Sequence, residues 1–355
     1  MPNLPEQLDL NTRLRLEQEF FETPFLMSYS GLSKLTFSPA AFYQNYVCKQ
    51  KGDQGSQGMN EGKLIHCLLL NPETFDDTFL VLPDKMPSDN PRQIINSVYE
   101  YRRMVVQSVG GNDDLVPKAF MDFKDIVLEN MKSANLYQAL KTDEQRLEKV
   151  MDDKSVDYWH YLLAKDSKTI VDYDTVEFAK LVASKFKDDR QLKYLMGVDR
   201  DPMSGKIEVF NEVELTSFPG DLPFGRRGFI DNLVIDYTNK KVLINDLKKT
   251  SKDIASFPES IEFYRYWMQA STYYDLTIEY LKANLPNWEE YQVEFRFVVI
   301  DNYLQMAAIK VSSETMMDWH MRTSAELEKA KWHFENRNFS LPHAFASQPD
   351  NELVI

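Results

Sequence analysis

The strongest constraint on the fold is a change in hydrophobic period along the chain. Before about residue 200 the apolar residues mostly recur at helical spacing, whereas after Ile207 they alternate with polar residues in successive runs. Those runs are 207–215, 225–236 and 240–250. Alternation is typical of a half-buried β-strand, and the longer period is typical of an amphipathic helix. We therefore predict helices in the first part of the chain and a β-sheet in the second.

The remaining elements predict a layered fold. Short helices are expected at 11–22 and within 29–50, where Ser38 is a suitable N-cap and Pro39 a suitable first helical residue. Further elements are a long amphipathic stretch over 174–196, a helix over 258–281, a strand pair joined at Asp301-Asn302 and a helix over about 313–337. This order predicts an α/β or α+β fold with a central mixed sheet flanked by helices.

The second and third strands form a hairpin whose register follows from the sequence. Thr238-Asn239 is the only polar, turn-prone point between them, so a turn centred there places Asp231 opposite Asp246. Cβ atoms of directly opposed residues lie roughly 5 Å apart. Because side chains alternate between faces, both acids share a face with Lys248 and with apolar residues nearer the turn. Those apolar residues are Leu233, Ile235, Val242 and Ile244.

Two interpretations of this acidic end of the hairpin are open. Carboxylates so close repel each other unless a cation lies between them, and such oxygen ligands suit Mg²⁺ or Mn²⁺. The plainer interpretation is a surface hairpin whose acids are solvated and paired with lysines at its rim.

Other segments carry residues that could serve such a site. In the helix expected after the hairpin, Arg265, Gln269 and Tyr273 are spaced i, i+4 and i+8 and form one polar stripe, unless they are an ordinary solvated face. The core residues expected in this region are Ile261, Tyr264, Trp267, Met268 and Tyr274. His66 lies in an apolar helix, where a lone histidine is more often a core residue than a ligand. Arg226, just before the second strand, would contact phosphate or simply carry surface charge.

Composition narrows the class of protein. A chain of 355 residues with 43% hydrophobic and 13% aromatic content is typical of a globular protein with a large core. Its two cysteines, Cys48 and Cys67, cannot supply the four ligands of an iron–sulfur cluster, and they suggest a reducing compartment. No apolar run reaches the length of about 18 residues that a membrane span needs, and the charged N-terminus is not a signal peptide. We expect a cytoplasmic protein. A net charge of −14 argues against nucleic-acid binding, although bound metal ions would offset part of it.

In their order and spacing, these segments resemble the PD-(D/E)XK nuclease superfamily, and within it the phage exonuclease VIII (RecE)-like branch of RecB-like nucleases. The segments that carry the resemblance are "YSGLSKLTFSPAAFYQNY", "EGKLIHCLLLNPETFDDTFLV", "GFIDNLVID…VLINDLKKT" and "RYWMQASTYY". The resemblance implies a restriction-endonuclease-like core, formed by a single domain over 1–355 with a mainly helical insertion at about 92–200. Ile230 stands where the superfamily commonly has proline.

The resemblance also implies a role for each matching residue. The catalytic residues would be Asp231, Asp246 and Lys248. The metal ligands would be His66, Asp231, Asp246 and the carbonyl of Leu247. An additional acid often precedes the first aspartate, and Glu212 is preferred over Glu208 and Glu214. Residues expected to support the site or contact DNA are Gln269, Tyr273, Arg265, Arg226 and Lys249.

The activity implied by the resemblance is Mg²⁺-dependent hydrolysis of phosphodiester bonds at double-stranded DNA ends, in the 5′→3′ direction, in phage-type recombination or DNA degradation. The expected partners are duplex DNA ends, a single-strand annealing protein and further copies of the chain in a ring around DNA. If the protein is phage-encoded, it would act in the cytoplasm of the bacterial host. Two alternatives are an endonuclease or end-processing repair nuclease with the same chemistry, and a non-catalytic interaction protein with a nuclease fold.

Overall fold

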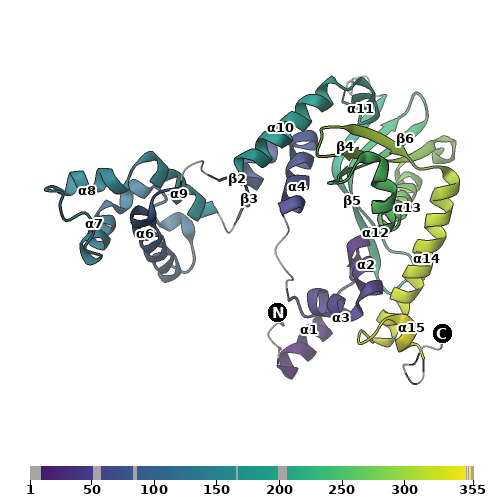
Figure 1. Ribbon diagram of the computed structural model, residues 1–355. Coiled ribbons are helices and arrows are strands. Elements are labelled where there is room, and N and C mark those ends of the chain that lie inside the picture. Colours follow the sequence, from purple (N-terminus) through teal and green to yellow (C-terminus); the bar gives the residue numbers. More distant parts are fainter. Residues whose placement is uncertain are drawn as a thin grey trace. The chain divides into compact units, whose positions relative to one another are not determined.

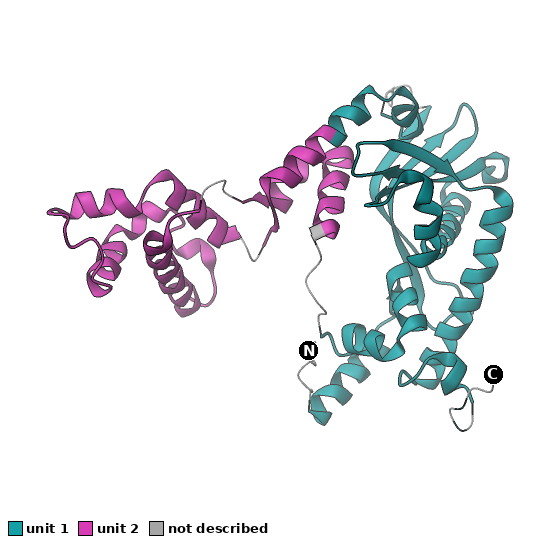
Figure 2. Ribbon diagram, in the orientation of Figure 1, with its two compact units in different colours: residues 1–55, 182–355 teal, residues 56–181 magenta. Residues whose placement is uncertain are grey.

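A computed structural model describes residues 9–50, 57–82, 86–164, 167–198, 206–348, 350 and 352 (Figure 1). The chain divides into two compact units, of which unit 1 comprises residues 1–55 and 182–355 and unit 2 comprises residues 56–181 (Figure 2). The positions of the two units relative to one another are not determined, so each is described by itself. Among the described residues, no helix is both long and apolar enough to cross a membrane.

Unit 1 is built on a six-stranded mixed sheet, as the hydrophobic period predicts. Its strands are β1 (Leu26–Met27), β4 (Ile207–Ser217), β5 (Gly225–Asp236), β6 (Lys241–Lys249), β7 (Gln292–Ile300) and β8 (Met306–Lys310). The order is β1-β5-β6-β7-β8, with β4 also paired to β5. The β1–β5 and β6–β7 pairs are parallel, and the other pairs are antiparallel.

Strand β5 pairs with three other strands. On one side of β5, β1 and β6 pair with different parts of it, and we call the place where they separate the fork. Strand β4 runs along β5 from Arg226 to Asp236, while β1 pairs with its first two residues and β6 with residues 232–236. Because β4 occupies one side of β5, β1 and β6 must share the other. Residues 227–231 therefore lie between the two pairings on that side, and Asp231 is the last of them.

Unit 1 also contains helices, and several of them pack on the sheet. The helices are α1 (Leu10–Glu22), α2 (Tyr29–Phe37), α3 (Pro39–Phe42), the end of α10 (Tyr173–Asp188), α11 (Arg190–Leu195), α12 (Phe257–Phe263), α13 (Tyr266–Asn284), α14 (Ser313–Asn336) and α15 (His343–Ala346). One core cluster joins residues of α2, α3, α12, α13 and α14 to one face of the sheet. Its members include all four apolar hairpin residues that the sequence assigns to one face, so that assignment is confirmed. The predicted helix N-cap at Ser38 is confirmed. Its side chain accepts a hydrogen bond from the Ala41 amide, and Pro39 is the first helical residue.

Two predicted helices are broken, and the single-helix predictions are wrong. The helix expected over 258–281 is α12 and α13, separated at Arg265, whose φ of 56° lies in the left-handed region. As a result Tyr264, predicted to be core, is 54% exposed, while Trp267 and Met268 are buried as expected. The stretch 174–196 divides into α10 and α11, because the Asp189 side chain caps a new helix by accepting from Leu192 N.

Unit 2 is mainly helical. It contains α4 (Gln57–Leu70), α5 (Phe75–Thr78), α6 (Asp89–Ser108), α7 (Lys124–Ser133), α8 (Asp143–Val150), α9 (Asp153–Ala164), the start of α10, and a parallel pair of β2 (Phe79–Val81) with β3 (Thr169–Val171). Its main core surrounds Trp159, which is fully buried against Phe120 and Phe123 and donates to the Lys118 carbonyl at 2.8 Å. The unit begins and ends earlier than the predicted insertion at 92–200. That the whole chain acts as one nuclease domain stays a prediction.

Candidate active site

The two predicted acids lie at the fork between β5 and β6. The ladder pairs Asn232 with Asn245 and continues in one register to the turn, as the sequence predicts, and Asp231 and Asp246 are the next residues beyond this last pair. Asp246 is fully buried, and Asp231 is half-buried. Beyond the last paired residues, the Leu247 amide donates to Asp231 Oδ2 at 2.7 Å instead of to the β5 backbone. This bond ties the first acid to the strand that carries the second.

Lys248 joins the acids to form a charged cluster. Its Nζ lies 2.5 Å from Asp246 Oδ2, and the side chains of the lysine and the aspartate are 13% and 0% exposed. Burial alone would lower the pKa of this ammonium, but the charges of Asp246 and Asp231 outweigh burial and raise the pKa above its ordinary value. The ammonium also lies 4.9 Å from the centre of the Tyr266 ring, a cation–π contact. This end of the hairpin is therefore a buried ionic cluster, and the solvated-rim interpretation does not describe it.

Helix α13 positions the second acid. Gln269 Nε2 donates to Asp246 Oδ1 and to the Tyr273 hydroxyl oxygen, both at 3.0 Å. Burial, followed by the charges of Asp246 and Asp231, raises the pKa of Tyr273, so this phenol stays neutral. Gln269 and Tyr273 are both buried, which excludes the solvated-face interpretation of their helix. The glutamine thus fixes the rotamer of a carboxylate that faces an ammonium on its other oxygen.

An asparagine row fixes the register beside the acids. Asn245 Nδ2 donates to Asn232 Oδ1 at 2.8 Å, and Asn232 Nδ2 donates to Asn211 Oδ1 at 2.9 Å, across β6, β5 and β4. The first two also donate to the carbonyls of Leu195 and Met196 at 3.0 and 3.2 Å, at the end of α11. Asn211, Asn232 and Asn245 are next in sequence to Glu212, Asp231 and Asp246. Because side chains alternate along a strand, the asparagines point to the opposite face of the sheet from these acids. A slip of one residue would break this network and turn the acids away from Lys248.

The donor set at the fork suits a hard divalent cation. Asp231 and Asp246 supply carboxylate oxygens, and the Leu247 carbonyl oxygen lies 3.5 Å from Lys248 Nζ within the same cluster. Mg²⁺ commonly binds one or two carboxylates together with water and substrate phosphates, so two carboxylates fit it. Among the described residues, no group of three or more His, Cys, Asp or Glu side chains could hold a metal ion. The fit to Mg²⁺ therefore depends on this pair of carboxylates.

The other predicted ligands differ in their placement. The β4–β5 ladder keeps one register on both sides of Glu212, which places this residue across from Asp231. Glu212 is exposed, and its φ of 49° lies in the left-handed region. His66 lies half-buried in α4 of unit 2, whose position relative to the fork is not determined, so its role as a ligand stays a prediction.

The predicted phosphate-binding cations make contacts within the protein. Arg226 is buried, with Nη1 3.3 Å from Asp275 Oδ2 and Nη2 paired with Glu279, so its charge is balanced by α13. Lys249 donates to the Thr250 carbonyl at 3.2 Å and to the Asn302 side chain. Their contacts with DNA stay predictions.

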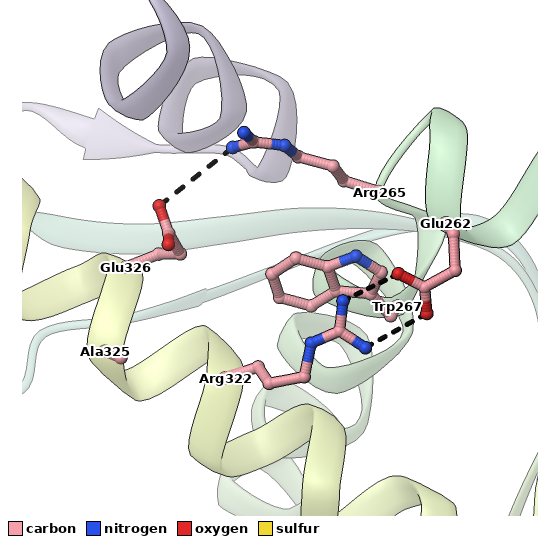
Figure 3. A pocket seen from close by; sticks show the side chains of 6 residues that line it. All are labelled: Glu262, Arg265, Trp267, Arg322, Ala325 and Glu326. Atoms are coloured by element: carbon pink, nitrogen blue, oxygen red, sulfur yellow. Dashed lines mark hydrogen bonds and ion pairs between the residues drawn. The ribbon is translucent and has the colours of Figure 1, made fainter. Parts of the chain in front are cut away.

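Arg265 does not share a stripe with Gln269 and Tyr273, because the break between α12 and α13 turns it elsewhere. It lies in a pocket of about 410 Å³ formed with α14, shown in Figure 3. There it donates to Thr36 Oγ1 at 3.0 Å and lies 4.0 Å from Glu326. Beside it, Arg322 forms a two-pronged pair with Glu262 above the Trp267 ring (Figure 3). The prediction of a single Arg265–Gln269–Tyr273 face is therefore wrong.

Sequence reasoning missed three residues at the site. Tyr266 lies under the Lys248 ammonium, and burial raises its pKa to about 12. Burial also raises the pKa of Tyr29, and the charges of Lys248 and Asp246 act on this phenol in opposite directions. Gly228 lies so close to Tyr273 that an added Cβ would be 2.8 Å from the ring. The only sequence signals were the tyrosines themselves and a glycine within a strand, which often marks a close approach.

Known proteins resemble this chain in structure and not in sequence. No family model matches the sequence, and no curated protein matches it. Among solved structures, the chain is similar to a protein from Eubacterium rectale that is named a putative exonuclease, in a crystal structure at 2.19 Å resolution. The TM-score is 0.43 at 10% sequence identity, with 93% of this chain and 87% of that chain covered. A similarity of this size says nothing about activity, so the functional argument depends on the site.

Proposed function

We propose that the protein is a metal-dependent deoxyribonuclease of the PD-(D/E)XK type that degrades DNA from duplex ends. The observation that supports this proposal is the cluster at the fork: two carboxylates on adjoining strands, with a buried lysine 2.5 Å from one of them. A scaffold protein would have no need of this arrangement, because replacing a buried ion pair by apolar residues is often neutral or stabilising.

The chemistry follows from the donor set. Asp231, Asp246 and the Leu247 carbonyl would hold Mg²⁺, with His66 as a further candidate ligand. When bound, Mg²⁺ supplies a more acidic water and withdraws negative charge from a phosphate. Gln269 keeps Asp246 in its rotamer, and Tyr273 holds Gln269 in turn.

Lys248 would either position the attacking water or stabilise the negative charge that develops on the phosphoryl oxygens. Its contact with Asp246 Oδ2 at 2.5 Å holds the ammonium at the cluster in either role.

The finer proposals follow the resemblance stated above. They are 5′→3′ polarity, a ring of several copies around the duplex and cooperation with an annealing protein. A ring with a positive channel and a negative exterior would reconcile DNA binding with a net charge of −14.

The test uses end-labelled linear duplex DNA and covalently closed circular DNA, each incubated with and without Mg²⁺. Wild type is expected to degrade the linear DNA only with Mg²⁺ and to leave the circle intact, whereas Lys248→Ala and Asp246→Ala are expected to be inactive but folded. Lys240→Ala is the matched control, because this exposed lysine lies in the turn at the opposite end of the same hairpin. Full activity in either site variant would remove the proposed site, and cleavage of the circle would identify an endonuclease instead.

A further inference from the structure

Three aromatic side chains lead from the lysine of the candidate site to the surface. Lys248 Nζ lies 4.9 Å from the centre of the Tyr266 ring, and the Tyr266 ring stacks on that of Tyr264 at 5.4 Å and 28°. Tyr264 in turn contacts Phe263 edge-on at 4.9 Å. Exposure is high at the outer end, at 54% for Tyr264 and 79% for Phe263. We call Phe263, Tyr264 and Tyr266 the aromatic corner.

The break between α12 and α13 creates this corner. In a continuous helix, residues two positions apart point away from each other, so Tyr264 and Tyr266 could not stack. The left-handed conformation of Arg265 between them ends α12 and starts α13 in a new direction. The break is thus what places the two tyrosine rings face to face beside Lys248.

The corner is rigid at its inner end and open at its outer end. Tyr266 packs against the rings of Phe257 and Phe297, which belong to the core cluster and are 1% and 0% exposed. Phe263 and Tyr264 bury little area against the core, so folding alone does not explain two large exposed rings at this position. Exposed, preorganised aromatic rings are the usual platform for unpaired nucleobases, because every base has a π-face.

We infer that the aromatic corner stacks an unpaired base of the DNA strand whose phosphate lies at Lys248. This inference rests on the proposed nuclease function and names its substrate more closely: a DNA end with at least one unpaired nucleotide. The continuity of ring contacts from Tyr264 through Tyr266 to Lys248 carries it, since a base on the outer rings would keep its strand beside the lysine. A base is neutral, so the stacking contact itself needs no positive charge.

The test measures binding in the presence of a chelator, so that its result does not depend on cleavage. Fluorescence anisotropy compares three labelled duplexes: one blunt, one with a short unpaired tail and one whose tail consists of abasic nucleotides. The abasic tail keeps the phosphates and removes the bases. Wild type is expected to bind the tailed duplex about tenfold more tightly than the abasic one, as expected for loss of one stacked base.

The variants separate stacking from general disruption. The double variant Phe263→Ala/Tyr264→Ala is expected to bind the ordinary and abasic tails equally. The double variant Phe263→Tyr/Tyr264→Phe keeps both rings and is expected to retain the preference. Tyr303→Ala is the matched control, because this tyrosine is 74% exposed and lies in the turn between β7 and β8.

Each outcome decides the inference separately from the nuclease assignment. If linear DNA is cleaved but wild type binds both tails equally, the aromatic corner has no stacking role and the nuclease proposal stands. If no DNA is cleaved but the base-dependent binding is lost only in the alanine double variant, the stacking site stands and the nuclease proposal fails. If the alanine double variant changes the sedimentation of the protein alone and not its DNA preference, the rings form a contact between copies and the inference is overturned.

Discussion

Gly228→Ala tests whether the close packing of α13 on β5 holds the site together. A Cβ at this position would lie 2.8 Å from Cδ1 and Cε1 of Tyr273 and 3.0 Å from Cδ1 of Leu276, where ordinary contacts are 3.4–4 Å. The Tyr273 ring cannot simply swing away, because it is buried and its hydroxyl accepts from Gln269. Either the ring or the helix must move.

The expected cost is the difference between two effects. Inserting a carbon into a well-packed core costs about 1–3 kcal/mol. The methyl group also restricts the unfolded chain, which stabilises the protein by about 0.4–1 kcal/mol. The net expectation is a loss of about 1–2 kcal/mol in the free energy of unfolding, and a fall in nuclease activity as Gln269 loses its alignment with Asp246.

The assay is denaturant unfolding, with Gly220→Ala as the control. A Cβ on Gly220 would meet no atom within 4 Å, so that variant should stay within about 0.5 kcal/mol of wild type. In a Tyr273→Ala background, where only Leu276 Cδ1 at 3.0 Å still lies close to the added Cβ, Gly228→Ala should cost clearly less. Equal stabilities of the two glycine variants, or a cost that is undiminished without the ring, would refute the close approach and the role given to Tyr273.

Three further predictions concern stability. Burial lowers the pKa of His333 below its ordinary 6.5, so the unfolded state takes up a proton first as pH falls. The free energy of unfolding should therefore decline below pH 6.5 by at most about 1.4 kcal/mol per pH unit, and denaturant midpoints of His333→Phe should lack this component. Asn245→Leu should cost about 2 kcal/mol in the same assay, because it leaves buried acceptors unpaired, and adding Asn232→Leu should cost less than the sum of the two. Without divalent metal, Lys248→Met should lose about 3 kcal/mol because the Asp246 carboxylate is left buried without its cation, and adding Asp246→Asn should restore most of this loss; a simple sum would contradict the pairing.

The hairpin could be predicted because its register depends on local chemistry. A polar turn between two apolar runs fixes which residues oppose each other, and alternation then fixes the faces. The observed turn is held by Asp236, whose side chain accepts from the amides of Thr238 and Asn239 at 3.1 and 2.9 Å. The expectation that Asp231 and Asp246 lie opposite each other follows from the same turn position.

The break at Arg265 could not be predicted, because no local signal marks it. The sequence around it has neither glycine nor proline, and its hydrophobic spacing continues that of a helix. Distant residues supply the contacts seen at Arg265, since its guanidinium lies against Thr36 of α2 and Glu326 of α14. A single sequence does not show such contacts, so the stacking of Tyr264 on Tyr266 was also missed.

The burial of Gln269 and Tyr273 could not be predicted from the sequence either. Both are polar residues that commonly lie on solvated helix faces, and only the packing of α13 over the fork places them at Asp246. The resemblance to a nuclease family indicated their importance, whereas hydrophobic periodicity argued for an ordinary surface. The Asn211–Asn232–Asn245 row went unnoticed because asparagine within a strand is usually a sign of a turn or an edge.

The central claim is that Asp231 and Asp246 act as one site with Lys248. The most direct test is the single-turnover cleavage rate of linear DNA at saturating Mg²⁺ for Asp231→Asn, Asp246→Asn and the double variant. Groups that act as a unit are strongly non-additive, so we expect each single variant to lose about a hundredfold or more and the double variant to lose little beyond that. Losses that multiply in the double variant, or wild-type rates in either single variant, would contradict a shared site.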